Sequence, residues 1–546
     1  MLNAFADSHE KLTSCDPPFS FYQLVDELAA QPTANFANAR RPLHRFFSLM
    51  RKMSVRSFLR EKLQLNAELV EEQDMLVSAT GNAVAVEATR ITCFNSRSAS
   101  LGWSPEELPD SSLLGYAVVI SAKATNFQMS HVYEAIVRPP MLLIAPNGRD
   151  LFPSAVSNYY IHNARLETTS IGPRTASRIL PIRGSYFAQQ NAITHVCAHA
   201  ALRMAVNSSP LFSARPKLTN KNINDCLKLQ LRDVPKGLSH MDMKQVIESI
   251  GGAVQIANFY IKPSMEYDHF VYPLMESGCP VILNVRGQSF SVPHTPQSQE
   301  IVHALAIMGH TLNTDRWEPE ARGGYGSYHR ETYVPAAAWT DHLIINDDNF
   351  GMLVTLPTDC LRNLLIPDKN PGLHAAEAVG IVPKEVKLGG LLAEEWATSV
   401  FVRLIDPVKQ FNPVPYWLDR LVKGPLACRT TLQTRDQYIS HIEAMTKLLG
   451  KILEPALKTE LQALPYWLWI SELTLPQLYT ANRHKIADVI LNAEADEKMH
   501  SSGASLLAMR LPGYWGFWHT KKNYSFPVTG HPALIAQVDE VRLCDW

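Results

Sequence analysis

Cys197, His303 and Asp347 are the residues of this chain whose types and order could support nucleophilic catalysis. Cys197 begins a segment that we expect to be helical, and the partial positive charge of a helix N-terminus favours a thiolate over a thiol. A histidine can accept the thiol proton, and a carboxylate can hold the imidazole in the required tautomer. His303 opens an apolar run and Asp347 closes another, so the three side chains predict a Cys-His-Asp triad.

Regular elements are needed to bring residues so far apart in the chain together. Hydrophobic periodicity and glycine or proline punctuation predict three helices and four strands in this region. The predicted helices are Cys197–Val206, Ser239–Ile250 and Tyr267–Glu276, and the predicted strands are Val254–Ile261, Val281–Val285, Val302–Gly309 and His342–Asn346.

Several local motifs in residues 187–352 resemble one known family. They are Cys197-Ala198-His199-Ala200-Ala201-Leu202-Arg203-Met204, Gly278-Cys279-Pro280 before an apolar strand, the run from His303 to Gly309, and Ile345-Asn346-Asp347. This part of the chain is similar to the papain-like cysteine peptidase superfamily, nearest to the bacterial branch of bacteriocin-processing, double-glycine-leader peptidases. The resemblance implies a helix bearing Cys197 that packs on an antiparallel sheet bearing His303 and Asp347.

The resemblance also implies an activity and an oxyanion hole. The expected reaction is cleavage of a peptide or isopeptide bond in a protein or peptide substrate through a thioester acyl-enzyme. The family's oxyanion glutamine usually lies six residues before the cysteine, where this chain has Asn191. Gln190 lies seven residues before Cys197 and is the expected oxyanion residue, with Gln189 and Asn191 as alternatives.

Three alternatives stay open from the sequence. Asp348 competes with Asp347 for the acidic role, because the end of a strand cannot be fixed to one residue. The same Cys-His-Asp order also suits acyl transfer to an amine, as in transglutaminases. A third possibility is an inactive papain-like scaffold that only binds a partner, with Arg40–Lys62 and the aromatic C-terminal region as binding surfaces. Taken singly, Cys197 could be a small core side chain and Asp347 could lie in an Asx turn.

The length of 546 residues predicts several domains. We expect a helical N-terminal region at 1–90, a small β-rich domain at 91–186, a papain-like domain at 187–388 and an aromatic-rich α/β region at 389–546. The fold class is therefore α+β. In the β-rich domain the predicted strands are Leu113–Lys123, His131–Val137, Asn158–Thr168 and Arg178–Tyr186.

Three segments outside the triad carry expectations of their own. Arg40–Lys62 alternates basic and apolar residues, which predicts a pair of amphipathic surface helices, with contact to nucleic acid or acidic lipid as the alternative. Trp317–Trp339 is rich in glycine and tyrosine and predicts a long loop that acts as a lid. Pro476–Leu491 has the pattern of an amphipathic helix.

Composition narrows the classes of partner and compartment. The net charge of −1 argues for neither nucleic acid nor membrane as a partner. The eight cysteines are scattered without a Cys-x-x-Cys pair, which is typical of a reducing, cytoplasmic setting. His195, Cys197 and His199 are two positions apart on a predicted helix and point in different directions. We therefore expect no metal ion and no cofactor.

Overall fold

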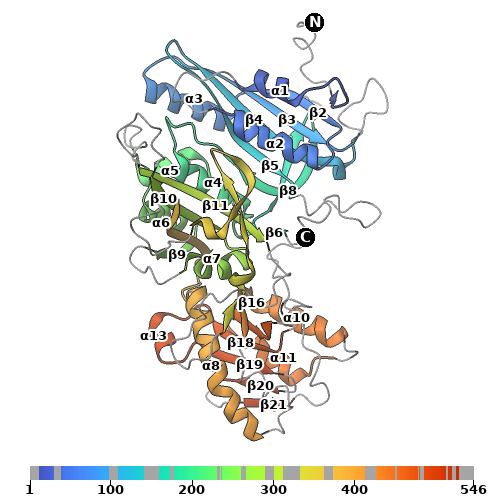
Figure 1. Ribbon diagram of the computed structural model, residues 1–546, viewed down its shortest axis with the longest axis vertical. Coiled ribbons are helices and arrows are strands. Elements are labelled where there is room, and N and C mark those ends of the chain that lie inside the picture. The colour runs from blue at the N-terminus through green and yellow to red at the C-terminus, as the bar shows by residue number, and fades with distance from the viewer. Residues whose placement is uncertain are drawn as a thin grey trace.

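The computed structural model describes residues 12–29, 38–96, 108–139, 159–172, 177–229, 234, 237–259, 266–288, 300–311, 333–361, 373–411, 426–448, 450, 452–476, 479, 485–511, 514–518 and 524–527. It confirms the predicted α+β class: three seven-stranded sheets carry helices against their faces. Figure 1 shows the three sheets in tiers, with the N-terminal sheet at the top and the C-terminal sheet at the bottom.

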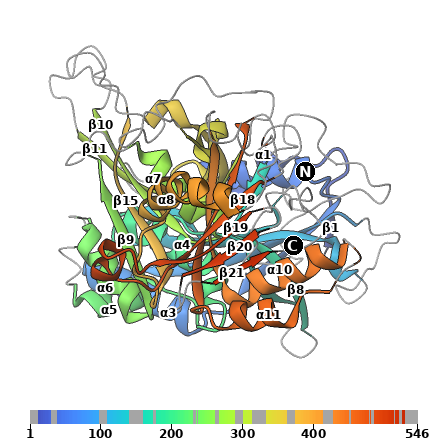
Figure 2. The ribbon, with the colours of Figure 1, turned by 90° about the horizontal axis from the view of Figure 1, so that it is seen from below.

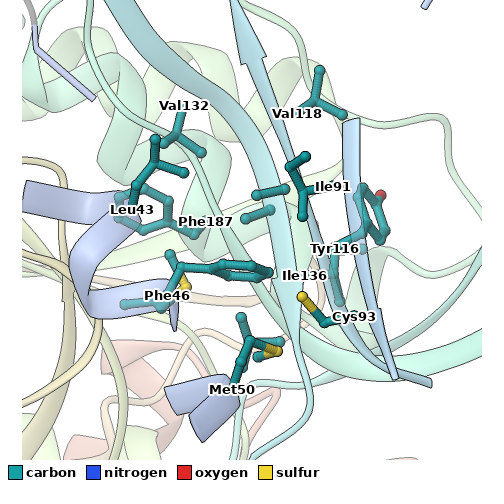
Figure 3. Close-up of a cluster of buried hydrophobic side chains, with 14 of the residues drawn as sticks. Leu43, Phe46, Met50, Ile91, Cys93, Tyr116, Val118, Val132, Ile136 and Phe187 are labelled. Atoms are coloured by element: carbon teal, nitrogen blue, oxygen red, sulfur yellow. The ribbon is translucent and has the colours of Figure 1, made fainter. Parts of the chain in front are cut away.

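The N-terminal sheet has the order β1-β2-β3-β4-β5-β8-β7. Helix α2 packs its apolar side on this sheet, and Figure 3 shows its Phe46 and Met50 beside Ile91 and Ile136 of the strands. Burial of each such side chain stabilises the fold by about 1.5–3 kcal/mol. The elements are β1 (Leu12–Ser14), α1 (Phe21–Leu28), α2 (Arg40–Lys52), β2 (Ser57–Leu63), α3 (Ala67–Thr80), β3 (Ala85–Phe94), β4 (Leu113–Lys123), β5 (Gln128–Val137), β7 (Arg165–Ile171) and β8 (Arg178–Phe187).

The basic segment Arg40–Lys62 is one helix followed by a strand, so the prediction of a helix pair is wrong. Helix α2 ends at Lys52, and Ser54 then adopts the left-handed backbone with a φ of 58°. The following residues form β2, which pairs with both β1 and β3. Pairing on two edges outweighs the local helical pattern. Strand β3 also runs across the boundary expected between residues 90 and 91, so one sheet unites both sides of it.

The central sheet is antiparallel, with the order β14-β13-β11-β10-β15-β9 and β6 paired to the end of β11. It places β11 and β13, the strands of His303 and Asp347, side by side. The predicted helices and strands of this region are confirmed with small shifts of their ends. They are β6 (Tyr159–Ile161), α4 (Cys197–Ser208), α5 (Asn220–Leu227), α6 (His240–Ser249), β9 (Gly252–Asn258), α7 (Tyr267–Glu276), β10 (Val281–Gln288), β11 (Glu300–Thr311), β13 (His342–Asp347), β14 (Gly351–Pro357) and β15 (His374–Pro383).

The C-terminal sheet has the order β12-β16-β17-β18-β19-β20-β21. Helix α8 packs on it, and α10 and α11, which lie side by side in Figure 2, share an apolar core with its strands. The helix predicted at Pro476–Leu491 is wrong at its end, where apolar residues form the buried strand β18. The elements are β12 (Val334–Pro335), α8 (Gly390–Phe411), β16 (Ala427–Thr434), α10 (Arg435–Leu448), α11 (Pro455–Gln462), β17 (Trp467–Thr474), β18 (Ala487–Asn492), α13 (Glu497–Ser501), β19 (Leu506–Leu511), β20 (Tyr514–Phe517) and β21 (Tyr524–Pro527).

The C-terminal sheet also settles the place of one tryptophan and of the described end of the expected lid. Trp469 is fully buried and donates a hydrogen bond from its indole nitrogen to the Leu388 carbonyl at 2.9 Å, so it belongs to the core. Most of the expected lid at Trp317–Trp339 lies outside the described residues. Its described end forms β12 and a 3-10 helix, Ala336–Trp339, in which the Trp339 ring is buried.

Helix α4 lies between the N-terminal and central sheets. Ala200 and Met204 join the core of the N-terminal sheet, while Leu202 packs with Ile282 of the central sheet. Every residue of α4 after Cys197 is buried. The helix is therefore fixed on both sides, and its first residue is the one that stays partly exposed.

Candidate active site

Cys197 is the first residue of α4, at the end that carries the partial positive charge of the helix dipole. The first N–H groups of a helix have no partner within it. Here the N–H groups of His199 and Ala200 both bond to the Val196 carbonyl, at 2.9 and 3.2 Å. The N–H groups of Cys197 and Ala198 precede these bonds and point out of the helix end.

His199 caps this helix end without adding charge. The N–H of Val196 donates to Nδ1 of His199 at 3.5 Å, and Nε2 of the same ring lies 2.9 Å from Oδ1 of Asn224. Nε2 must therefore carry the ring proton. Burial lowers the pKa of His199 to about 4, partly opposed by the bond to Asn224. A neutral cap leaves the electrostatic field at Cys197 to the helix and to His303.

The central sheet brings His303 to the acidic end of β13. Nε2 of His303 lies 3.2 Å from Oδ1 of Asp347 and 3.3 Å from Oδ1 of Asp348. Nδ2 of Asn349 lies 3.4 Å from the same nitrogen. The structure thus places both sequence candidates for the acidic role beside the histidine, and they share one ring nitrogen.

The surroundings of His303 favour its charged form. Burial opposes the charge, but hydrogen bonds to the side chains of Asp347 and Cys197 outweigh it. The negative charge of Asp348 acts in the same direction, and the pKa of His303 rises from 6.5 to about 11. A thiolate-imidazolium pair requires a charged imidazole beside both a carboxylate and a thiol, and the surroundings of His303 are of this kind.

Asp347 is held in place by the turn that it begins. Its Oδ1 accepts hydrogen bonds from the backbone N–H groups of Asn349 at 2.8 Å and Phe350 at 3.3 Å. The Asx turn considered from the sequence is therefore present, and the oxygen that makes it also faces His303. The preceding Asn346 anchors the strand end, since its Nδ2 donates to the Tyr186 carbonyl of β8 at 2.9 Å.

The three candidates for the oxyanion hole differ in what their side-chain amides already bind. Gln189 is buried and accepts from the Val132 N–H at 3.0 Å while donating to the Asn38 carbonyl at 3.0 Å. Asn191 donates to Glu72 and accepts from the backbone of its own turn. Among the described residues, no partner is found for the half-buried amide of Gln190.

Gln190 is also close to the acidic end of the site. Its backbone N–H lies near the carboxylate of Asp348, the neighbour of His303, and acts to lower the pKa of that group, although neither carboxylate oxygen has a hydrogen-bond partner among the described residues. The structure therefore assembles Gln190, Asp348 and His303 in one place. The side-chain amides of Gln189 and Asn191 are instead occupied by hydrogen bonds that hold the surrounding structure.

Arg45 on α2 supports the site in a way that the sequence did not reveal. Its Nε donates to the Met352 carbonyl at 2.9 Å, and its guanidinium also bonds to the Leu353 carbonyl. Gly351, with a φ of 113°, gives this side chain room, because a Cβ there would come within 2.8 Å of the Arg45 Cβ. The N-terminal sheet's helix thus holds the hairpin that carries Asp347. A glycine just after an acidic strand end was the available signal.

Replacing Arg45 by alanine should loosen this hairpin and lower the activity of the site by about tenfold or more, because small displacements of reacting groups are costly. The measurement is turnover of the wild type and the variant under saturating substrate, together with the thermal midpoint. Arg51→Ala, on the exposed side of the same helix, is the matched control and should leave turnover unchanged. Equal turnover for both variants would show that Arg45 does not support the site.

Asp348 is a second acid whose ionisation falls in the physiological range. Burial raises its pKa to about 7, opposed by the charge of His303 and supported by that of Asp347. Because the folded-state pKa is raised above 3.8, the stability linked to the proton is complete below about pH 4. That stability is lost as the pH rises through about 7.

Asp348→Asn removes this ionisation and should flatten the corresponding part of the stability profile. As the pH rises from 4.5 to 7.5, we expect the unfolding free energy of the wild type to fall by roughly 2–3 kcal/mol relative to that of the variant. Urea unfolding of both proteins across this range gives the difference directly. The contribution of His303 to the unfolding free energy changes only above its unfolded pKa of 6.5. The change in the acidic half of the pH range is therefore due to Asp348. Parallel profiles would contradict the assignment.

Metal ions could in principle use the same groups. His303, Asp347 and Asp348 offer ligand atoms that lie within 4.8 Å of one another. The trio His195, Cys197 and His199 is not assembled in that way, since the His199 ring binds Asn224. His195 instead faces Glu72 and His131 on the other side of the segment that precedes α4.

Comparison with known proteins gives no relative from which a function could be transferred. No family model matches the chain, and no curated protein matches it significantly. Within the described residues, no helix is long and apolar enough to span a membrane. The site must therefore be interpreted from its own geometry.

Proposed function

We propose that this protein is a cysteine hydrolase of the papain-like type that cleaves a peptide or isopeptide bond in a protein or peptide substrate. One observation supports the proposal: the imidazole of His303 lies 3.2 Å from the Asp347 carboxylate, and its pKa is raised in part by the thiol of Cys197, the first residue of a buried helix. The resemblance of residues 187–352 to that superfamily supports the same assignment. So does the position of α4 against an antiparallel sheet.

The geometry assigns different atoms of the histidine to different tasks. Nε2 of His303 faces Asp347, Asp348 and Asn349. This leaves Nδ1 for the Cys197 thiol. Asp347 would then orient the ring and stabilise its charged form, as the acid of a catalytic triad does. Asp348 adds a second negative charge when it ionises.

The reaction would follow two steps through a thioester. The Cys197 thiolate attacks the carbonyl carbon, and the His303 imidazolium gives its proton to the leaving amine as the C–N bond breaks. Water then attacks the thioester while His303 takes up a proton from it, and the carboxylic acid leaves as the thiolate is restored. The overall change is the addition of one water to the bond.

The oxyanion of the tetrahedral intermediate needs hydrogen-bond donors at the same place. The backbone N–H of Cys197 at the helix end and the side-chain amide of Gln190 are the donors we assign to it. One such donor is typically worth about 10²–10³ in rate. Gln190→Ala should therefore impair turnover more than substrate binding.

The experiment is digestion of a proteome-derived peptide library in water enriched in oxygen-18, with product masses as the readout. Hydrolysis creates new C-termini that carry the heavy oxygen. Acyl transfer to an amine, as in transglutaminases, instead gives crosslinks with loss of ammonia. No product of either kind, from protein whose fold is intact, would favour a binding scaffold and contradict the proposal. Repetition with a chelator separates thiol chemistry from a metal ion held by His303 and the two aspartates.

A further inference from the structure

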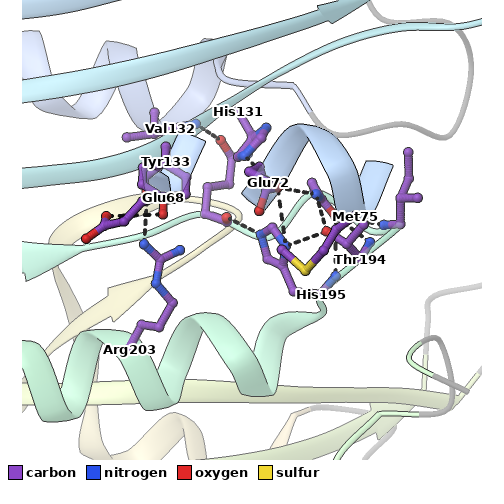
Figure 4. A network of polar contacts seen from close by, with 12 residues as sticks. Glu68, Glu72, Met75, His131, Val132, Tyr133, Thr194, His195 and Arg203 are labelled. Carbon is purple, nitrogen blue, oxygen red and sulfur yellow. Dashed lines mark hydrogen bonds and ion pairs between the residues drawn. The ribbon is translucent and has the colours of Figure 1, made fainter. Parts of the chain in front are cut away.

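A second cluster of chemically active side chains lies behind the loop that leads into α4. Glu72 of α3, His131 of β5 and His195 of the loop converge there, and Figure 4 shows them pointing toward one another from three separate elements. All three are buried, with relative exposures of 1%, 0% and 0%. The proposed hydrolytic chemistry uses none of them.

His131 is the residue of this cluster that the protein leaves unsatisfied. Neither of its ring nitrogens has a hydrogen-bond partner among the described residues, although the ring is completely buried. Buried polar groups almost always find partners, and a buried one without any needs an explanation such as a bound ion. The nearest carboxylate oxygen, Oε1 of Glu72, is 3.7 Å from Nε2, which is too far for a hydrogen bond.

His195 is oriented as metal-ligating histidines are. Its Nε2 lies 3.1 Å from the carbonyl oxygen of Gln189, so that nitrogen carries the proton and donates it. Nδ1 is consequently an acceptor. It takes a hydrogen bond from the Thr194 hydroxyl at 3.1 Å, which a metal ion would replace, and it lies 3.8 Å from Oε1 of Glu72. A ring N–H bonded to a backbone carbonyl is the usual outer contact of a histidine that binds a metal through its other nitrogen.

The spacing of these atoms suits a small divalent ion. Tetrahedral Zn²⁺ with ligand bonds of about 2.0–2.1 Å separates its ligand atoms by about 3.3 Å. The observed separations of 3.7 and 3.8 Å are within half an ångström of that value. The Thr194 hydroxyl also lies beside the cluster, where it accepts a hydrogen bond from Asn191 at 2.7 Å. Two imidazoles and a carboxylate favour zinc over the hard ions Ca²⁺ and Mg²⁺.

The electrostatics of the cluster agree with this geometry. Burial lowers the pKa of His131 to about 3, so its ring is neutral and can act as a ligand. Burial raises the pKa of Glu72, opposed by the charge of Arg203 and by hydrogen bonds such as that from Asn191 at 2.7 Å, and a bound cation would hold this carboxylate in its charged form. The guanidinium of Arg203 is bonded to the Tyr133 carbonyl and the Tyr186 hydroxyl, but its positive charge still acts on all three side chains.

We propose that Glu72, His131 and His195 bind one structural zinc ion that fastens α3 and β5 of the N-terminal sheet to the loop before Cys197. All three side chains are buried, so a substrate could not reach the ion, which suits a structural role. Its ligand His195 lies between Gln190 and Cys197 in the chain, so the ion would fix the segment that carries the oxyanion donor. This inference does not depend on the reaction that Cys197 performs.

The test is metal analysis of the full-length protein after dialysis, with binding as the readout. We expect about one zinc per chain in the wild type and at least a tenfold loss in His131→Gln and Glu72→Gln. His240→Gln, which removes a half-exposed histidine paired with Glu377, is the matched control and should keep the zinc. Asp348→Asn should keep it as well, which separates this site from the group around His303.

A second measurement uses only the wild-type protein, so its result does not depend on whether the variants fold. Chelator-treated wild-type protein is titrated with Co²⁺, and a visible absorption band that saturates near one equivalent is expected. Zn²⁺ should abolish the band and raise the thermal midpoint by several degrees. Absence of both bound zinc and a cobalt band, or full zinc content in His131→Gln, would overturn the proposal. Zinc that is lost only in Asp348→Asn would do the same.

Discussion

Cys197→Ala is expected to reduce hydrolysis of the best library peptide by at least about a thousandfold, and His303→Ala by a similar factor. The two side chains act as one unit, because the thiol becomes a strong nucleophile only beside the imidazolium. The loss should appear in kcat with little change in KM. Initial rates over a range of peptide concentrations give both constants.

The fold should survive these two substitutions, which makes the result interpretable. Cys197 is partly exposed and His303 lies at the edge of the core, so neither removes a large buried group. Circular dichroism and the thermal midpoint provide the check. The double variant should be no less active than either single variant, as expected for residues that serve one step. Retained turnover in either single variant would refute the assigned roles.

Arg429→Ala should destabilise the protein by about 3–5 kcal/mol, the largest effect we expect from a residue outside the site. The guanidinium is fully buried between α7 and the C-terminal sheet. Its Nε donates to Glu276 at 2.6 Å, and its Nη1 donates to Glu472 at 2.8 Å. Removing it leaves carboxylates in the core without their main positive partner. Urea unfolding followed by tryptophan fluorescence measures the change.

The exposed ion pair of Lys62 and Glu87 is the control for this prediction. Its atoms are 2.9 Å apart, only slightly farther than those around Arg429, but both side chains are more than half exposed. Surface pairs of this kind contribute little. Lys62→Ala should therefore leave the midpoint almost unchanged. Equal effects of the two substitutions would show that burial does not decide the strength of these pairs.

One helix of the central region and one strand of the N-terminal sheet show how much a sequence alone can predict here. The helix Tyr267–Glu276 and the strand Leu113–Lys123 were predicted with the bounds that the structure has. Both are long segments with strong apolar patterns and clear stops, where local pattern and tertiary structure agree. The order of Cys197, His303 and Asp347 followed from the ends of such elements, and this is why the three candidates could be named.

The failures arose where a contact distant in sequence decided the outcome. The strand Ser57–Leu63 exists because β1 and β3 pair with it, and local pattern favoured a helix there. The role of Arg45 depends on a hairpin about 307 positions away in the chain. The choice among Gln189, Gln190 and Asn191 rests on what their amides bind, and no spacing rule contains that information.

The most direct test of the account is the rate at which iodoacetamide labels each cysteine at pH 5.5, mapped by mass spectrometry. Ordinary thiols are almost fully protonated at this pH and react slowly. We predict that Cys197 is labelled at least about tenfold faster than the exposed Cys360 and that His303→Ala abolishes the difference. Labelling of Cys197 no faster than that of Cys360 in the wild type would contradict a thiolate-imidazolium pair.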